Sequence, residues 1–171
     1  MSNHMKAVPF NGIRIVHETF KDYDRVQFAM QMQLGSENLM DAVKRASTVP
    51  DEATYNREID ARYAGPSGFM RLTSLDHGKW IGRFGIKRRS VRWIFGNPAV
   101  ALTMLRHDIS AGLFVPIELL ITESEDGCGT IVTYIQPSSL IAISPDAHAL
   151  REAAERLDAK AATLVQELLS D

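Results

Sequence analysis

Residues 116–135, PIELLITESEDGCGTIVTYI, decide the fold of this chain. The two ends of this stretch, residues 116–122 and 130–135, are rich in residues that favour strands, and the loop between them contains Asp126-Gly127. Two such runs joined by an Asp-Gly loop predict a β-hairpin. Alternation along the first run predicts that one of its faces lies in the core, carrying Ile117, Leu119 and Ile121.

Four segments before the hairpin are also predicted as strands: residues 14–16, 25–34, 69–75 and 91–95. In residues 25–34, apolar side chains alternate with glutamine and alanine, which is the period of a strand with one buried face. The alternating apolar residues are Val26, Phe28, Met30, Met32 and Leu34.

Helices are predicted between these strands from their start signals. Ser36 is a predicted N-cap of a helix that ends near residue 47, and Pro50 opens a second helix. Asn97 is a predicted N-cap with Pro98 at the first helical position, which begins a helix that ends near residue 107. The basic stretch after His77 is predicted as a short helix or an ordered loop.

The last helix is predicted over residues 145–169, with Ser144 as its N-cap and Pro145 at its first position. Leucine and alanine recur along it at alternating spacings of four and three, a heptad-like stripe. Such a stripe usually packs on the helix's own sheet and less often forms a seam between subunits. The stripe consists of Leu150, Ala154, Leu157, Ala161, Leu164 and Leu168.

About five strands and four helices in mixed order predict an α+β fold with two layers. Its sheet is expected to be largely antiparallel, with the helices packed on one face. Residues 1–12 show no periodicity and are set aside as a disordered or tag-like N-terminus. Residues 13–171 are predicted to form a single domain, because no linker divides them.

The composition excludes several classes of protein. The chain has 171 residues, of which 45% are hydrophobic and 23% charged, which is far from the composition of a disordered chain. It has no run of apolar residues long enough to span a membrane, and we expect no membrane partner. Cys128 has no partner for a disulfide, and the N-terminus has no secretory signal, so we expect the protein in the cytoplasm.

The net charge of −2 hides an uneven distribution. Seven basic residues and no acidic ones lie between Asp76 and Asp108, which leaves 12 basic and 21 acidic residues elsewhere. This asymmetry indicates an anionic partner or a self-complementary surface, or else a solvated loop that acidic helices balance. The seven are Lys79, Arg83, Lys87, Arg88, Arg89, Arg92 and Arg106.

Several short motifs between residues 69 and 143 resemble a known bacterial and archaeal family, domain of unknown function 302. They are Asp76-His77 after a strand, the junction WIFGNP at residues 93–98, the segment GLFVPI at residues 112–117 and the acidic hairpin at residues 123–134. The resemblance implies a compact α+β domain that forms homodimers. It implies no activity, because the family has none assigned.

Four residues in this region are candidates for a ligand site: His77, Arg89, Arg92 and Asn97. An imidazole can carry a proton near neutral pH or bind a metal, although His77 also fits a structural role at a strand end. Free backbone N–H groups at the helix start after Asn97, aided by Arg89 or Arg92, could hold a carboxylate or phosphate. Asn followed by Pro is also what an ordinary capped helix uses.

The histidines and Cys128 lack the spacing of a zinc site, and the glycines match no phosphate-binding loop, so no metal or cofactor is predicted. The leading hypothesis is a homodimer that binds a small anionic ligand in a cleft near His77, Arg92 and Asn97. An alternative is an enzyme with His77 as its acid or base, although the sequence does not support an enzyme. A third, disfavoured alternative is nucleic-acid binding through the basic segment 79–106 and its aromatic residues.

Overall fold

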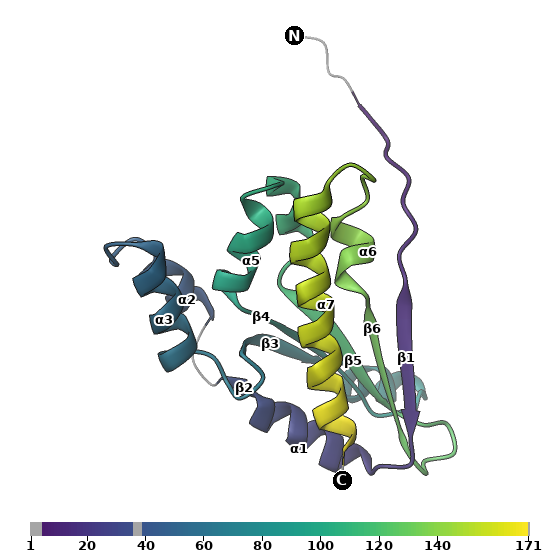
Figure 1. Cartoon of the computed structure of the whole chain (residues 1–171). Coiled ribbons are helices and arrows are strands. Elements are labelled where there is room, and N and C mark those ends of the chain that lie inside the picture. Colours follow the sequence, from purple (N-terminus) through teal and green to yellow (C-terminus); the bar gives the residue numbers. More distant parts are fainter. Residues whose placement is uncertain (1–4, 36–38, 171) are drawn as a thin grey trace.

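The computed structural model describes residues 5–35 and 39–170. Six strands form one sheet in the order β1-β6-β5-β4-β3-β2, and the long helix α7 crosses in front of it (Figure 1). The strands are β1 (Arg14–Thr19), β2 (Leu34–Gly35), β3 (Phe69–Asp76), β4 (Ser90–Gly96), β5 (Ile117–Glu123) and β6 (Thr130–Ile135). The helices are α1 (Tyr23–Gln33), α2 (Leu39–Arg45), α3 (Glu52–Arg62), α4 (His77–Ile81), α5 (Pro98–Leu105), α6 (Pro137–Ile141) and α7 (His148–Leu169), with short helical turns η1 (Gly82–Phe84) and η2 (Ile109–Leu113).

The sheet confirms the α+β prediction and contains one strand more than the five expected. Neighbouring strands pair antiparallel throughout, except that the two-residue strand β2 pairs parallel with the start of β3. The predicted hairpin is β5 and β6, in which Leu119 lies opposite Tyr134 and Ile121 opposite Val132. Ile117, Leu119 and Ile121 are buried as predicted.

The core lies between the sheet and α7. All six residues of the heptad-like stripe are buried, each at most 5% exposed, and they belong to the same cluster as the buried residues of β4, β5 and β6. The prediction that the stripe packs on the helix's own sheet is therefore confirmed. Because these side chains are covered within one chain, they cannot form a seam between subunits.

The prediction of a strand at residues 25–34 is wrong, because residues 23–33 form helix α1. Asp22 caps this helix by accepting hydrogen bonds from the backbone N–H groups of Asp24 and Arg25. Only the helically spaced side chains Tyr23, Val26 and Met30 are buried, whereas Phe28 is 64% exposed and Met32 59% exposed. The apolar residues of this segment fit both the two-residue period of a strand and the 3.6-residue period of a helix. Its glutamine, methionine and alanine residues favour the helix.

The predicted start of the last helix is also wrong. Residues 144–146 form a turn, and α7 begins only at His148, without a side-chain cap. The carbonyls of Ala142 and Ser144 instead accept hydrogen bonds from Arg151, one turn into α7. The short helix α6 occupies Pro137–Ile141, so the chain has to turn after it before α7 can begin.

The predicted start of α5 is confirmed, whereas the helix predicted to open at Pro50 begins at Glu52, so Pro50 lies before its cap. Asp51 caps α3 through the N–H of Thr54, and Asn97 caps α5 with Pro98 next to it. The predicted N-cap Ser36 lies outside the described residues, and the described part of the next helix, α2, begins at Leu39. The basic stretch forms α4 and η1, as predicted for a short helix or ordered loop.

The centre of the opposite sheet face is uncovered. Successive side chains of a strand point to opposite faces, so the residues that alternate with the buried ones along each strand face away from α7. Leu120 lies between Arg92 and Thr133, and Val16 lies on the far side of Thr133. Among the described residues, Val16, Ile94, Leu120 and Ile131 belong to neither buried cluster. We call these four residues the open-face cluster.

Candidate functional site

A cavity of about 360 Å³ lies where the end of β4 and the start of β5 meet α2, α5 and α7. Among the described residues its lining is almost entirely hydrocarbon, with Asn97 as the one polar side chain. Val43, in α2 at one edge, is 46% exposed, so the cavity borders solvent on that side. The lining residues are Leu39, Val43, Phe69, Gly96, Asn97, Pro98, Val100, Ala101, Met104, Leu105, Gly112, Val115, Pro116, Ile117 and Leu157.

Two of the short motifs noted in the sequence form adjoining walls of this cavity. The junction at residues 93–98 supplies Gly96, and the segment at residues 112–117 supplies Pro116, which follows a cis peptide bond. The two residues are in close contact, since a Cβ atom at Gly96 would lie 3.1 Å from Cβ of Pro116. The fold thus places both motifs around one apolar space.

The polar groups of Asn97 are all in use. Its Oδ1 accepts hydrogen bonds from the backbone N–H of Ala99 at 2.8 Å and of Val100 at 3.3 Å. Its Nδ2 donates to the carbonyl of Gly68 at 2.9 Å and to Asp60 at 3.4 Å. Pro98 has no N–H, and the N–H of Ala101 bonds to the carbonyl of Asn97. The start of α5 therefore offers no free donor to an anion.

The predicted cationic residues are paired with carboxylates. Arg89 forms ion pairs with Asp24 at 2.9 Å and Glu123 at 2.8 Å, and its guanidinium stacks 4.4 Å from the centre of the Tyr23 ring. Arg92 donates to Glu118 across the sheet at 2.8 Å. Arg88 and Arg106 pair in the same way with Glu125 and Glu52. The acidic remainder of the chain neutralises much of the basic segment.

These contacts shift the ionisation of the groups involved. The hydrogen bond from Arg89 holds the pKa of Glu123 below its ordinary value, and the pairing with Glu123 and Asp24 raises the pKa of Arg89. Burial raises the pKa of the neighbouring Tyr23 hydroxyl. The shifts of Glu123 and Arg89 favour the charged forms of the ion pair, which therefore stabilises the fold at neutral pH, and the raised pKa of Tyr23 keeps its hydroxyl neutral.

The sheet separates the predicted site residues. His77 follows the end of β3, where Asp76 lies opposite Val91, and Asn97 follows Gly96 at the other end of β4. The six steps from Ser90 to Gly96, at about 3.3 Å each, put these two ends about 20 Å apart. His77 does not line the cavity, and its Nδ1 accepts a long hydrogen bond of 3.4 Å from the indole of Trp80. The four residues do not share one cleft.

The aromatic residues of the basic segment divide into two groups. Trp93 and Phe95 are core residues, 3% and 1% exposed. Trp80 and Phe84 lie on α4 and η1 beyond the sheet edge, with exposures of 56% and 76%. No continuous stacking platform for bases is formed, because the strand aromatics point into the core.

The sequence did not single out the cavity, because its lining looks like ordinary core. Phe69, Met104 and Leu157 carry no chemical signature that separates a cavity wall from a packed interior. The available signal was the pair of motifs at residues 93–98 and 112–117. These two motifs marked this region of the chain, but they did not reveal the cavity between them.

Two other kinds of feature, a metal site and a membrane-spanning helix, are not found among the residues the structure describes. In residues 5–35 and 39–170, no three His, Cys, Asp or Glu side chains gather closely enough to hold a metal ion. No helix in the same residues combines the length and hydropathy needed to cross a membrane.

Residues 43–168 match the family model described as "Domain of unknown function DUF302". The chain belongs to the DUF302 family. The match extends on both sides of the motif region at residues 69–143 and includes the end of α2, all of α3 and nearly all of α7. Both motifs that line the cavity lie within it. No curated protein matches the chain.

A solved DUF302 structure has the same fold. The uncharacterized conserved protein DUF302 from Bacillus stearothermophilus superposes with a TM-score of 0.61. It is 15% identical in sequence, and the alignment covers 91% of this chain and 97% of the other. At this identity the likeness concerns the fold alone.

Proposed function

We propose that this DUF302 protein binds a small molecule with an apolar body in the cavity at the end of β4. The carrying observation is a volume of about 360 Å³ lined by hydrocarbon, with a single polar side chain that has no free hydrogen-bonding group. Ligand sites of small molecules typically have about 300–1,000 Å³ and mostly apolar walls. Dividing by about 30 Å³ per water-sized group gives room for roughly a dozen such groups.

The geometry favours binding over catalysis. Catalysis needs groups that move protons or attack a substrate, and the walls formed by residues 39–157 carry none. Placing an anion next to Arg89 or Arg92, as the sequence suggested, would require it to displace Glu123 or Glu118. The small-ligand hypothesis is therefore retained, with the site moved from the basic segment to the apolar cavity.

Filling the cavity tests this function. Ala101 lines it, so Ala101→Phe should occupy the space, whereas Ala53→Phe places the same side chain on an exposed part of α3. Octanol and small substituted benzenes should raise the unfolding midpoint of the wild type and of Ala53→Phe by several degrees and leave Ala101→Phe unchanged. Equal shifts in all three proteins, or none in the wild type, would refute ligand binding in this cavity.

We also propose that two copies associate through the open-face cluster. The five longer strands are each about 20 Å long and lie about 4.8 Å apart, so their face has a projected area of about 500 Å². Because side chains protrude from the sheet, the accessible area of this face is larger and approaches the ~600 Å² per side of small specific interfaces. The charges at its centre, Arg92 and Glu118, already neutralise each other. A face of balanced charge with an apolar cluster at its centre is complementary to a second copy of itself.

Light scattering tests the dimer. The wild type should have twice the mass of one chain at micromolar concentration, and Leu120→Glu should reduce it to a monomer by placing unpaired charges in the interface. Ile109→Ser, which changes a side chain that is 81% exposed on η2, should remain dimeric. A wild-type monomer would remove the proposal.

We place the protein in a reducing cytoplasm. Its single cysteine, Cys128, is exposed and unpaired, and free exposed thiols suit a compartment that keeps them reduced.

A further inference from the structure

The segment that joins β3 to β4 lies largely in solvent. It consists of α4, η1 and the chain up to residue 87, and we call residues 77–87 the tip. Three of its apolar side chains are exposed, Trp80 by 56%, Phe84 by 76% and Ile86 by 55%. Single exposed apolar residues are ordinary, but several close together mark an interaction surface. None of the three lines the apolar cavity, so this surface is separate from the site proposed above.

Local contacts give the tip a defined shape. Asp76 caps α4 by accepting a hydrogen bond from the N–H of Lys79 at 3.0 Å. The rings of Trp80 and Phe84 meet edge to face, with their centres 6.4 Å apart. Gly85 has a φ of +85°, a conformation that favours glycine and lets the chain turn back toward β4. The exposed aromatic rings are therefore held in place before any partner binds.

The tip is also basic. Lys79, Arg83 and Lys87 are exposed, and residues 77–87 contain no acidic residue. Lys79 makes only a loose pair with Asp76, at 3.8 Å and with 85% of the lysine side chain exposed. Basic and apolar side chains thus follow one another along a single exposed segment. Such a surface is complementary to a partner that is negatively charged at its surface and apolar beneath it.

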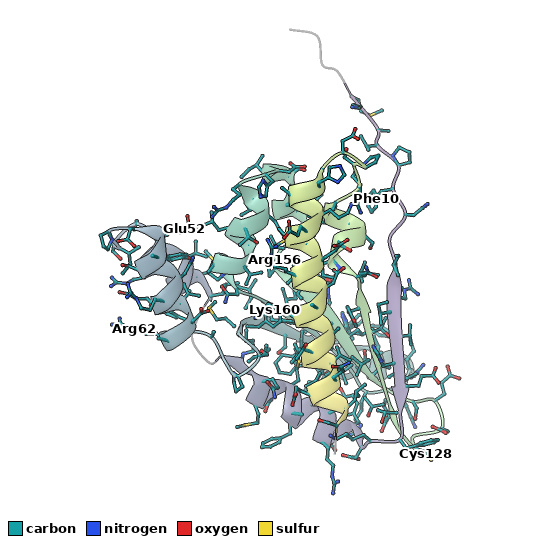
Figure 2. All side chains as sticks on the ribbon, viewed as in Figure 1. Phe10, Glu52, Arg62, Cys128, Arg156 and Lys160 are labelled. Atoms are coloured by element: carbon teal, nitrogen blue, oxygen red, sulfur yellow. The ribbon has the colours of Figure 1, made fainter. Side chains whose placement is uncertain are left out.

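The acidic hairpin loop lies at the same end of the sheet. β4 begins where β5 ends, and the loop that follows β5 contains Cys128, which is labelled in Figure 2. Arg88 pairs with Glu125 at 3.2 Å, and Arg89 pairs with Glu123 at 2.8 Å. These two carboxylates are therefore held by arginines that follow the tip rather than by the cations within it.

We propose that the tip docks on the surface of an anionic lipid bilayer. Tryptophan and phenylalanine side chains enter the boundary between head groups and acyl chains, and lysine and arginine bind anionic head groups. The cytoplasmic leaflet carries such lipids, and it faces the compartment in which we place the protein. The sequence led us to expect no membrane partner because no segment can span a bilayer, but docking on its surface needs no span.

Nucleic acid is the other polyanion that a basic aromatic surface could bind, and the tip fits it less well. Ile86 has no ring to stack on a base. The planes of Trp80 and Phe84 lie at 74° to each other, so the two rings cannot stack on successive parallel bases. A fluid bilayer interface accepts side chains in any orientation, and the observations therefore favour lipid.

Vesicle sedimentation with the full-length protein tests the proposal. Phosphatidylcholine vesicles that contain phosphatidylserine should bind the wild type at least about tenfold more tightly than vesicles of phosphatidylcholine alone, and added salt should weaken the binding. Trp93 is buried, so the quenching of tryptophan fluorescence by a water-soluble quencher reports mainly on Trp80. Bound anionic vesicles should protect this fluorescence from quenching.

A pair of charge variants assigns the electrostatic part of the binding. Replacing both Arg83 and Lys87 with Gln should weaken binding by about fivefold for each charge removed. Replacing both Lys44 and Arg57 with Gln changes the net charge equally but alters exposed cations on α2 and α3, and it should leave vesicle binding unchanged.

A second pair assigns the apolar part. Phe84→Ser should weaken binding by about tenfold, because the ring no longer enters the interface. Leu113→Ser alters a side chain that is 82% exposed on η2, before the start of β5 and so at the opposite end of the sheet, and it should bind as the wild type does. Unfolding midpoints check that each variant is folded.

The outcomes are decisive for the lipid assignment. Equal binding to neutral and anionic vesicles, no binding to either, or unchanged binding of the tip variants would overturn it. If single-stranded DNA binds through the tip and vesicles do not, the tip is a nucleic-acid site and the proposal fails. None of these results depends on whether octanol binds in the cavity.

Discussion

The two ends of strand β4 contrast in charge and in packing. One end leads into Gly96 and Asn97, where apolar walls surround a cavity and the one polar side chain is fully hydrogen-bonded. The other end leads back to Arg89, where charged side chains pair at the surface, and to the exposed aromatics of α4 and η1. The charged end attracts notice in the sequence, whereas the apolar end has the shape of a binding site.

The difference shows why charge along a sequence is a weak guide to a site. A basic run binds an external anion only if the fold leaves its charges free. Here the arginines already form ion pairs with Asp24 on α1 and with Glu118 and Glu123 on β5.

The largest effect is expected at the apolar end. Asn97→Ala removes the cap of α5 and leaves the buried groups around it without hydrogen bonds, which should destabilise the protein by about 2 kcal/mol. Chemical denaturation measures the change. A loss under about 0.5 kcal/mol would mean that Asn97 does not hold this end together.

Asn97→Asp is the matched control. Aspartate can still accept from the N–H groups of Ala99 and Val100, but it cannot donate to Gly68 and it faces Asp60. The free energy of unfolding of Asn97→Asp should therefore lie between the values of the wild type and Asn97→Ala at neutral pH, if capping and the hydrogen bond to Gly68 both contribute.

A smaller effect is expected at the charged end. Glu123→Gln weakens the ion pair with Arg89, which is 46% exposed at the surface, and should cost about 1 kcal/mol or less at neutral pH. Denaturation across a pH series measures it. Glu125→Gln, which alters a side chain that is 88% exposed, serves as the control and should change little.

The pH dependence of this effect has a definite sign. The folded-state pKa of Glu123 lies below its ordinary value of 4.5, so its stabilisation is complete above pH 4.5 and is lost as the pH falls through the lowered folded pKa. The difference in the free energy of unfolding between the wild type and Glu123→Gln should disappear in that acidic range. A difference that stays constant into acid would show that the charge of Glu123 does not cause it.

The smallest effect is expected at the aromatic tip of the charged end. Phe84 is 76% exposed, so Phe84→Ser should change the free energy of unfolding by at most about 0.5 kcal/mol. Binding of octanol in the cavity should be unchanged, because Phe84 does not line it. A large loss of stability would mean that the tip packs more firmly than its exposure indicates.

Local signals predicted several elements because their chemistry is complete within a few residues. The Asp-Gly loop between two β-rich runs specified the hairpin of β5 and β6, and the Asn-Pro pair specified the start of α5. Where two local patterns compete, the sequence is ambiguous. Residues 25–34 alternate like a strand, and the cap at Asp22 together with packing of Val26 and Met30 made them a helix.

The candidate site was predicted less well because it depends on distant partners. Asn97 was identified as a cap and does line the cavity, but His77, Arg89 and Arg92 lie away from it. Whether an arginine is free depends on the carboxylates that the fold brings to it. The motifs at residues 93–98 and 112–117 were visible in the chain, but not the space between them.

Spacing and turn chemistry act between residues that are close along the chain, and they were sufficient to predict the fold class, the central hairpin, the α5 cap and the buried stripe of α7. Folding in three dimensions set which charges are neutralised and brought Gly96 against Pro116 beside a hollow. A cavity is a property of how distant surfaces meet, and an ion pair depends on the distance between groups that lie far apart along the chain.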